Sequence, residues 1–231
     1  MKSRDEFISE YYDKYFGELC NSGLQGKGSR KFHQLVEKYW LNDSPTNVLE
    51  VGAGIGEHFP FVKLANRHGI AQYTALDIRD QANLNLKLGT DNATINWKIG
   101  SVQDMPFEDE RFDRVLSTCL FHHIDDPLEA FREVRRVTTV RGEIAIGFPT
   151  DPGVANQALK KIYTYRKAKK IGIDNPAFVY ALEHRNQIAG LLSILKEVFS
   201  NDKVTFHYWP TKLPSWNLNL VIVAHIVKSG A

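Results

Sequence analysis

Three glycines at alternate positions, Gly52, Gly54 and Gly56, follow the short apolar segment Asn47–Val51. Glycine adopts backbone angles that other residues avoid, and it lets a ligand touch the main chain. Asp77 comes 21 residues after Gly56, at the end of the next apolar segment. A carboxylate at this spacing can accept hydrogen bonds from both hydroxyls of a ribose. The turn and the acid together predict a site for a ligand that carries a nucleoside.

The glycine spacing and the charge of Glu50 distinguish between possible ligands. The glycines run G-x-G-x-G, whereas dinucleotide-binding turns use G-x-G-x-x-G to bring a pyrophosphate onto a helix N-terminus. Glu57, His58 and Phe59 occupy that place here. Glu50 would direct a negative charge at the site, which repels a pyrophosphate and attracts an ammonium or sulfonium group. The pattern favours a cationic nucleoside ligand; a tight strand-to-helix turn without a ligand is the alternative.

Two further candidates follow the third predicted strand, in the segment GSVQDMPF. Asp104 could accept a hydrogen bond from the exocyclic amine of a base, and Met105 could pack against the ring. Taken alone, Asp104 fits a turn or a helix cap better. Beside Glu50, the glycines and Asp77, we expect it to face the base.

Strand and helix patterns alternate along the part of the chain that carries these residues. Such alternation predicts a parallel sheet with helices on both faces, whose carboxyl edge binds the ligand. The expected strands are Asn47–Val51, Ala71–Leu76, Ala93–Ile99, Phe112–Ser117, Gly142–Phe148 and the C-terminal pair Lys203–Tyr208 and Asn219–Val227. The expected helices are 4–16, 30–40, 59–68, 80–88, 126–137, 154–170 and 186–199, with a flexible glycine-rich connector over 22–29.

The chain resembles the class I S-adenosylmethionine-dependent methyltransferases in four ordered segments: VLEVGAGIGEH (48–58), ALDIRD (75–80), GSVQDMPFEDERFDRVLS (100–117) and HHIDDPLEAFREVRRVTTVRGEI (122–144). The resemblance implies an α/β, Rossmann-like fold: a mostly parallel seven-stranded sheet with a C-terminal antiparallel strand pair and helices on both faces. It implies S-adenosylmethionine as cofactor and S-adenosylhomocysteine as product. We expect one domain over 1–231, made of an N-terminal helical lid (1–44), a cofactor-binding core (45–150), a helical substrate cap (151–202) and the strand pair (203–231).

The family's pattern also implies a role for each matching residue. The main chain of the glycine turn and of Ser117 would contact the methionine part of the cofactor, Glu50 its amine, Asp77 the ribose, and Ile78, Asp104 and Met105 the adenine. The cofactor-binding residues implied are Glu50, Gly52, Ala53, Gly54, Gly56, Asp77, Ile78, Asp104, Met105 and Ser117. The segment after the fourth strand lacks the Asn-Pro-Pro-Tyr signature of enzymes that methylate base or amide nitrogens, which argues against those acceptors.

His123 and His122 are the candidate catalytic residues, because histidine titrates near neutral pH and both follow the fourth strand. His123 is the favoured base; loop capping by one histidine and solvent exposure of the other is the alternative. Tyr11 could reach the cofactor from a lid hinged at 23–28 and contact the sulfonium by a cation–π interaction. Plain packing of an amphipathic helix is the alternative for Tyr11. His184 and Arg185 are weaker candidates for the acceptor pocket.

Composition limits the partners. The chain has 231 residues with a net charge of +2, and its two cysteines form no CxxC, so we predict no metal site. No leader or membrane span is apparent, so we expect a cytoplasmic monomer or homodimer. The basic run Lys160–Lys170 could bind an anion, although a solvated helix face is the simpler interpretation. We therefore expect a small-molecule acceptor and no nucleic-acid partner.

Methyl transfer to a small molecule, such as a sugar or a natural-product intermediate, is the leading functional hypothesis. Oxygen is favoured over nitrogen or carbon as the methylated atom. The alternatives are a nicotinamide-dependent oxidoreductase, a binding module without turnover, and an RNA methyltransferase that uses the basic run.

Overall fold

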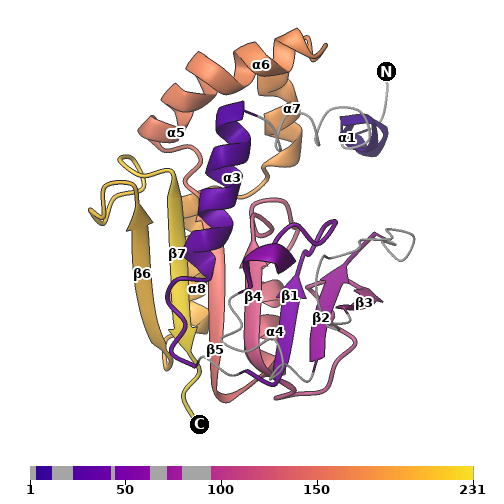
Figure 1. Cartoon of the computed structure of the whole chain (residues 1–231), viewed down its shortest axis with the longest axis vertical. Helices are drawn as coiled ribbons and strands as arrows, with labels where there is room; N and C mark the ends of the chain where they lie inside the picture. The colour runs from indigo at the N-terminus through magenta and orange to yellow at the C-terminus, as the bar shows by residue number, and fades with distance from the viewer. Residues whose placement is uncertain (1–3, 12–22, 43–44, 63–71, 80–94, 231) are drawn as a thin grey trace.

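The computed structural model describes residues 4–11, 23–42, 45–62, 72–79 and 95–230. Seven strands form one sheet in the order β3-β2-β1-β4-β5-β7-β6 (Figure 1). The first five are parallel, and β7 lies antiparallel between β5 and β6. The strands are β1 (Asn47–Val51), β2 (Gln72–Asp77), β3 (Ile95–Ile99), β4 (Phe112–Thr118), β5 (Thr138–Pro149), β6 (Lys203–Trp209) and β7 (Val221–Val227). The predicted fold class is confirmed.

Helices pack on both faces of this sheet (Figure 1). Alternation along β1 sends Val48 toward α3 and Leu49 toward α4 and α8, so each face has its own apolar core. The described helices are α1 (Arg4–Tyr11), α3 (Gly23–Val36), α4 (Pro127–Val137), α5 (Val154–Leu159), the π-helical turn η4 (Lys160–Thr164), α6 (Tyr165–Lys170), α7 (Pro176–Glu183), α8 (Ile188–Val198) and the 3-10 turn η2 (Phe59–Phe61).

The strand order reverses beside β1, whose neighbours are β2 on one side and β4 on the other. In open parallel sheets, the carboxyl ends of strands at such a reversal form the ligand-binding edge. Helices α5, α6 and α7 lie at this end of the sheet, above the strands in Figure 1. The predicted division into lid, core, cap and strand pair stays a prediction.

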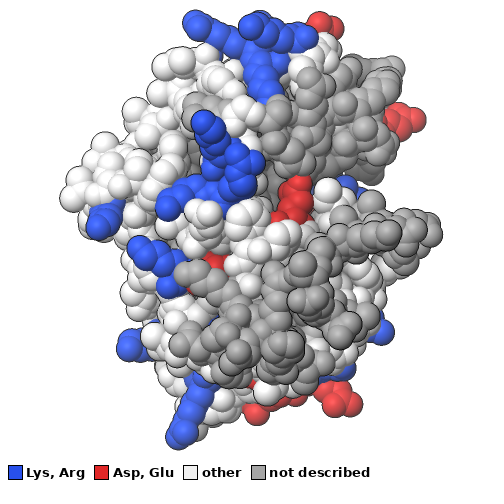
Figure 2. All heavy atoms as spheres, viewed as in Figure 1, with Lys and Arg blue, Asp and Glu red and all other residues white. Residues whose placement is uncertain are grey.

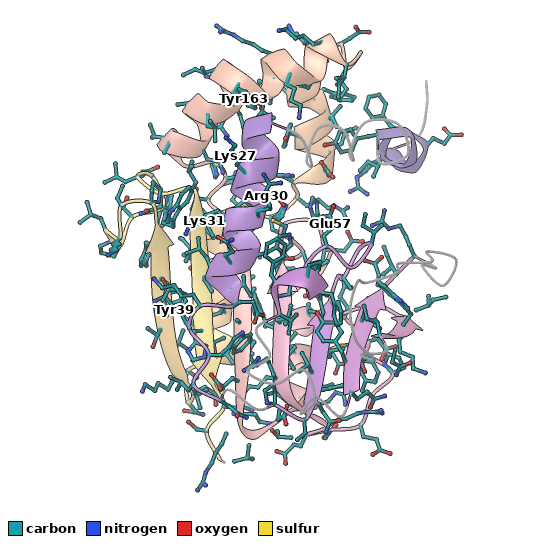
Figure 3. The ribbon with its side chains drawn as sticks, in the orientation of Figure 1. Lys27, Arg30, Lys31, Tyr39, Glu57 and Tyr163 are labelled. Carbon is teal, nitrogen blue, oxygen red and sulfur yellow. The ribbon has the colours of Figure 1, made fainter. Side chains whose placement is uncertain are left out.

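The expected flexible connector at 22–29 is wrong over residues 23–29, which form the first half of α3. Two close contacts hold this helix in place. A Cβ on Gly23 would lie 2.5 Å from the Tyr163 hydroxyl, and one on Gly147 of β5 would lie 2.3 Å from the Phe32 ring. Figure 3 shows Tyr163 beside the first turn of α3. Such packing outweighs the roughly 1 kcal/mol by which each glycine disfavours a helix. The hinge predicted at 23–28 is wrong for the same reason.

Several element bounds also differ from prediction. Helix α7 was not predicted, and the helix expected over 30–40 ends at Val36. Strand β5 begins at Thr138, directly after α4, where the Thr138 hydroxyl donates to the carbonyl of Val134 at 2.6 Å. The helix expected over 126–137 is confirmed, with the Asp126 side chain accepting from the Glu129 amide. The expected helix 80–88, and the later parts of those over 4–16 and 59–68, lie largely or wholly outside the described residues.

Candidate functional site

The glycine turn after β1 is covered at Gly52, where a Cβ would lie 2.7 Å from the Leu120 side chain, and is open at Gly54. Gly52 and Gly54 have φ angles of 68° and 54°, in the left-handed region that favours glycine. The amides of Gly52 and Ala53 both donate to the carbonyl of Leu76, which ties the turn to β2. A Cβ on Gly54 would meet no atom of the described residues within 4 Å, so the part of the chain that the structure describes leaves this peptide uncovered. A ligand can therefore approach the backbone here.

Asp77 joins this turn to the end of β2. The Gly54 amide donates to Asp77 Oδ2 at 2.8 Å, and the Arg79 amide donates to Oδ1 at 3.0 Å. Arg79 Nε also donates to Oδ1, at 3.4 Å. These bonds fix the carboxylate beside the glycine turn, and Oδ2, with one donor, keeps a lone pair for a ligand hydroxyl. The sequence-based expectation that the turn and Asp77 converge is confirmed. Contact between Asp77 and a ribose stays a prediction.

Glu50 is a buried carboxylate, 1% exposed, inside the same edge. The Tyr73 hydroxyl donates to its Oε2 at 2.7 Å. Burial raises the pKa of Glu50 to about 7, and the charges of Glu37 and Asp77 add to this, against the lowering by His58 and the Tyr73 hydrogen bond. Among the described residues Glu50 has no ion pair, so an incoming ammonium group would supply the missing positive charge.

The segment after β3 is held next to Asp77, because the Gly100 amide donates to the Asp77 carbonyl at 3.0 Å. Asp104 lies in this segment with its side chain exposed, whereas Met105 is 3% exposed within the apolar core. The Met105 amide donates to the Glu133 carboxylate at 2.7 Å. Arg136 donates to that carboxylate and to the carbonyls of Met105 and Phe107. Sequence reasoning missed this Glu133–Arg136 clamp, which positions the segment.

Ile78 and Ser117 flank the edge from β2 and β4. Ile78 is 73% exposed, an apolar surface free to cover a planar base. Ser117 is fully buried, and its hydroxyl has no hydrogen-bond partner among the described residues. A buried hydroxyl without a partner is costly unless a ligand or water satisfies it. Glu50, Ser117 and the uncovered main chain at Gly54 thus fit a ligand that brings an ammonium group and polar atoms.

Tyr11 lies elsewhere than at the glycine turn. It is 4% exposed and packs with Ala168, Ile173 and Val179 of the α6–α7 region. Helix α1 is further held to α7 by the edge-to-face contact of Phe7 with Phe178, whose ring centroids are 5.5 Å apart. The contact of Tyr11 with the sulfonium stays a prediction.

The two candidate catalytic histidines meet a third, His184, at the carboxyl end of β4. The ring centroid of His122 lies 3.8 Å from that of His123 and 4.4 Å from that of His184. The amides of Arg185 and Asn186 donate to the His122 carbonyl, which fastens the segment after α7 to the loop after β4. The structure thus brings together residues that are about 60 positions apart.

Hydrogen bonds orient two of these imidazoles. His123 Nδ1 lies 3.0 Å from the Glu183 carbonyl, and His184 Nδ1 lies 3.1 Å from Asp151 Oδ2. Burial, the charge of His184 and more distant cations lower the pKa of His123 to about 3, although its bond to Glu183 opposes this. Burial also holds the pKa of His122 well below its ordinary range. Both rings are therefore neutral at physiological pH.

Lys160 departs from the solvated face expected of the basic run. It is 6% exposed, and its ammonium lies 2.5 Å from Asp151 Oδ2. Burial lowers the pKa of Lys160, while the ion pair with Asp151 opposes that shift. Asp151 thus links Lys160 to His184, a network that the sequence did not suggest because its members lie in separate predicted elements.

Residues 49–146 match the family described as "Methyltransferase domain". Among solved structures, the chain is similar to a chain of the complex between the Haloferax volcanii Trm112 methyltransferase activator and a methyltransferase (18% identity, TM-score 0.62, covering 99% of this chain and 100% of that chain). It is also similar to the [4+2]-cyclase SpnF (14% identity, TM-score 0.62, covering 92% of this chain and 84% of that chain). A third similar structure is that of a Listeria monocytogenes protein assigned to the S-adenosylmethionine-dependent methyltransferases (14% identity, TM-score 0.61, covering 87% of this chain and 100% of that chain). At these identities the solved structures establish the fold.

The order and direction of the seven strands are those of a Rossmann-like methyltransferase fold. Residues 49–146 match the methyltransferase-domain family, in agreement with the resemblance predicted from the sequence. Among the described residues, no helix has the length and apolar character that crossing a membrane requires.

Proposed function

We propose that this protein is an S-adenosylmethionine-dependent methyltransferase that transfers the methyl group to an oxygen atom of a small-molecule acceptor. The observation that carries the proposal is the imidazole cluster at the carboxyl end of β4, one strand away from the glycine turn. It supplies neutral ring nitrogens that can receive a hydroxyl proton. Helices α5, α6 and α7, which lie over this end of the sheet, would enclose the acceptor (Figure 1).

The cofactor-binding side of the proposal uses the edge formed by β1, β2 and β4. Glu50 would pair with the methionine ammonium and Asp77 would accept from the ribose hydroxyls. Ile78 would cover one face of the adenine and Asp104 would accept from its amine. The described geometry supports this assignment because the glycine turn, Glu50 and Asp77 are joined by hydrogen bonds and electrostatic contact.

S-adenosylmethionine supplies an electrophilic methyl group and leaves as S-adenosylhomocysteine. The chain's own task is to hold the acceptor oxygen in line with that methyl and to exclude water. As the new O–CH3 bond forms, the S–CH3 bond breaks with its electron pair returning to sulfur, and the acceptor proton must leave. His123 Nε2 is the proposed acceptor of that proton, because Nδ1 donates to the Glu183 carbonyl. The proton then passes to solvent.

A panel of hydroxylated, amine and carbon-acid small molecules incubated with S-adenosylmethionine tests this proposal. We expect S-adenosylhomocysteine formation with a hydroxylated acceptor, and loss of turnover in His123→Ala with cofactor affinity kept. His207→Ala, on β6, is the matched control and should keep turnover. Turnover confined to amines would refute the oxygen assignment, and equal loss of turnover and cofactor affinity in His123→Ala would assign that residue a structural role.

An RNA acceptor is the second candidate, favoured by the cations on one face of the molecule. Figure 2 shows Lys and Arg side chains gathered over α6 and along α3. Lys27, Arg30 and Lys31 are exposed on α3 (Figure 3). Lys161, Arg166 and Lys169 line a hollow of about 430 Å³ beside α7. RNA binding through these groups would weaken steeply with salt. Absence of RNA affinity at low salt removes this candidate.

A further inference from the structure

Three imidazoles from two distant segments form a compact cluster of ligand atoms. Each of His122, His123 and His184 offers one ring nitrogen, and these nitrogens all lie within 4.8 Å of one another. Ions such as Zn²⁺ bind imidazole nitrogen at about 2.0–2.1 Å, which places nitrogens of a tetrahedral site about 3.3 Å apart. The cluster therefore needs only a modest contraction, through rotation of the rings, to surround one ion.

The hydrogen bonds made by Nδ1 on two of the rings leave Nε2 of those rings available for an ion. The partners of His123 and His184 are a carbonyl oxygen and a carboxylate oxygen, both of which only accept. Each Nδ1 must therefore carry a proton, and Nε2 is the nitrogen through which each ring would bind an ion. A histidine that ligates a metal nearly always donates its other nitrogen to a carboxylate or backbone carbonyl in this way.

His122 contributes an unsatisfied atom. It is 5% exposed, and its Nδ1 is buried with no hydrogen-bond partner among the described residues. A buried polar atom without a partner carries a desolvation cost that a bound ion would remove. This is a second observation, independent of the ring spacing, that points to a ligand inside the cluster.

The charges around the cluster tolerate a cation. Asp151 and Glu183 are acidic and at most half-exposed, and Lys160 is the buried base beside them. Arg4 and Arg79 also act on His123, but both are exposed, so solvent screens them. The formal charges of Asp151, Glu183 and Lys160 thus sum to −1, which favours a cation in the cluster.

We propose that His122, His123 and His184 form a three-histidine site for one divalent cation of the Zn²⁺, Co²⁺ or Ni²⁺ type. Imidazole selects such ions over Mg²⁺ and Ca²⁺, which prefer oxygen. Asp151 is a positioning residue, since it holds the His184 ring through Nδ1. Three protein ligands leave a fourth position open, the pattern of catalytic rather than structural zinc sites. The sequence offered no metal pattern because His184 is far along the chain from His122 and His123.

The open position gives the ion a role that rests on the proposed function. An acceptor hydroxyl bound there would lose its proton more readily, because a divalent ion stabilises the alkoxide. The resulting oxygen attacks the methyl carbon, the S–CH3 electron pair returns to sulfur, and the proton goes to solvent. In the metal-bound protein His123 Nε2 is a ligand, and it is then no longer required to hold that proton.

Cobalt binding to the untagged, chelator-treated full-length protein tests the site. We expect one Co²⁺ per chain with the visible absorption of a four-coordinate site, displaced by Zn²⁺. Asp151→Asn should weaken binding about 10–100-fold, the usual effect of losing a second-shell partner, and His184→Ala should weaken it more. His207→Ala should leave it unchanged. Thermal melts confirm that each variant is folded.

X-ray absorption of the zinc-loaded wild-type protein provides a readout that needs no variant. Imidazole ligands around the zinc support the site, and a shell without imidazole overturns it. Absence of stoichiometric cobalt binding, or equal binding by folded His184→Ala, also overturns it. Calorimetric titration of the same samples with S-adenosylmethionine tests the proposed function separately, because the cofactor residues Glu50 and Asp77 lie outside the cluster. Cobalt binding with no cofactor binding would refute only the proposed function.

Discussion

Replacing Glu50 with Gln should remove a pH dependence from cofactor binding. The buried carboxyl has a pKa of about 7, so at pH 7 about half of the molecules carry a neutral Glu50. Only the ionised form can pair with an ammonium group, which means that binding must expel a proton from the other half. The expected release at pH 7 is about 0.5 proton per cofactor bound.

The same equilibrium predicts how affinity falls in acid. If only ionised Glu50 binds, the observed affinity scales with the ionised fraction, which drops about fivefold between pH 7 and pH 6. The cofactor's own α-amine, with a pKa near 7.7–8.0, stays protonated over this interval and so adds little slope. Glu50→Gln keeps the side-chain shape and an oxygen that can accept from the Tyr73 hydroxyl, but it cannot titrate.

Isothermal titration calorimetry with S-adenosylhomocysteine, in buffers of different ionisation enthalpy, measures both quantities. The wild-type protein should show buffer-dependent heats at pH 7 and the fivefold loss at pH 6. Glu50→Gln should bind more weakly at pH 7 and show neither effect. A wild-type affinity that is flat between pH 6 and pH 7, or a Gln variant with the same slope, would refute the placement of Glu50 beside the amine.

Three further predictions concern the same edge. Without cofactor, Glu50→Gln should stabilise the protein by about 3 kcal/mol at pH 8, and not at pH 4, in urea melts. The reason is that folding raises the pKa of Glu50 from 4.5 to about 7, so the wild-type protein loses stability as the pH rises through that interval. Equal stability of variant and wild type at pH 8 would contradict this. Asp77→Ala should weaken cofactor binding by about 1–3 kcal/mol in calorimetry, because the ribose hydroxyls lose their acceptor, and unchanged affinity would show that Asp77 faces no ribose. Gly54→Val should abolish cofactor binding and cost about 1–3 kcal/mol of stability, because valine is strained at a φ of 54°. A Cβ at this position meets no atom of the described residues within 4 Å, so the stability cost comes from the backbone. A folded variant with wild-type affinity would contradict the approach of a ligand to this peptide.

Local patterns were sufficient to predict the sheet and its binding edge. Strand β1 matched its expected bounds because its five consecutive residues alternate between the two cores. The N-cap Asp126 followed by Pro127 predicted the start of α4. The placement of Asp77 beside the glycine turn followed from the parallel arrangement, whereas its bond to the Gly54 amide was not predicted. These features depend on period and turn chemistry, which a single sequence displays.

Features that depend on long-range packing were not predictable. The glycine-rich start of α3 is helical because Phe32 seats directly on Gly147 and Gly23 approaches Tyr163, contacts that join positions more than 100 residues apart. The convergence of His184 on His122 and His123 similarly depends on how α7 returns to the end of β4. Lys160 looked like one of many surface cations, and only its pairing with Asp151 reveals it as buried.

A crystal structure of the protein with S-adenosylhomocysteine tests the central claim most directly. We predict the cofactor product across the carboxyl ends of β1, β2 and β4, with its amine at ion-pair distance from Glu50 and its ribose hydroxyls donating to Asp77. Density for the product at another place on the fold, or in this edge with its amine and ribose turned away from both carboxylates, would contradict the account.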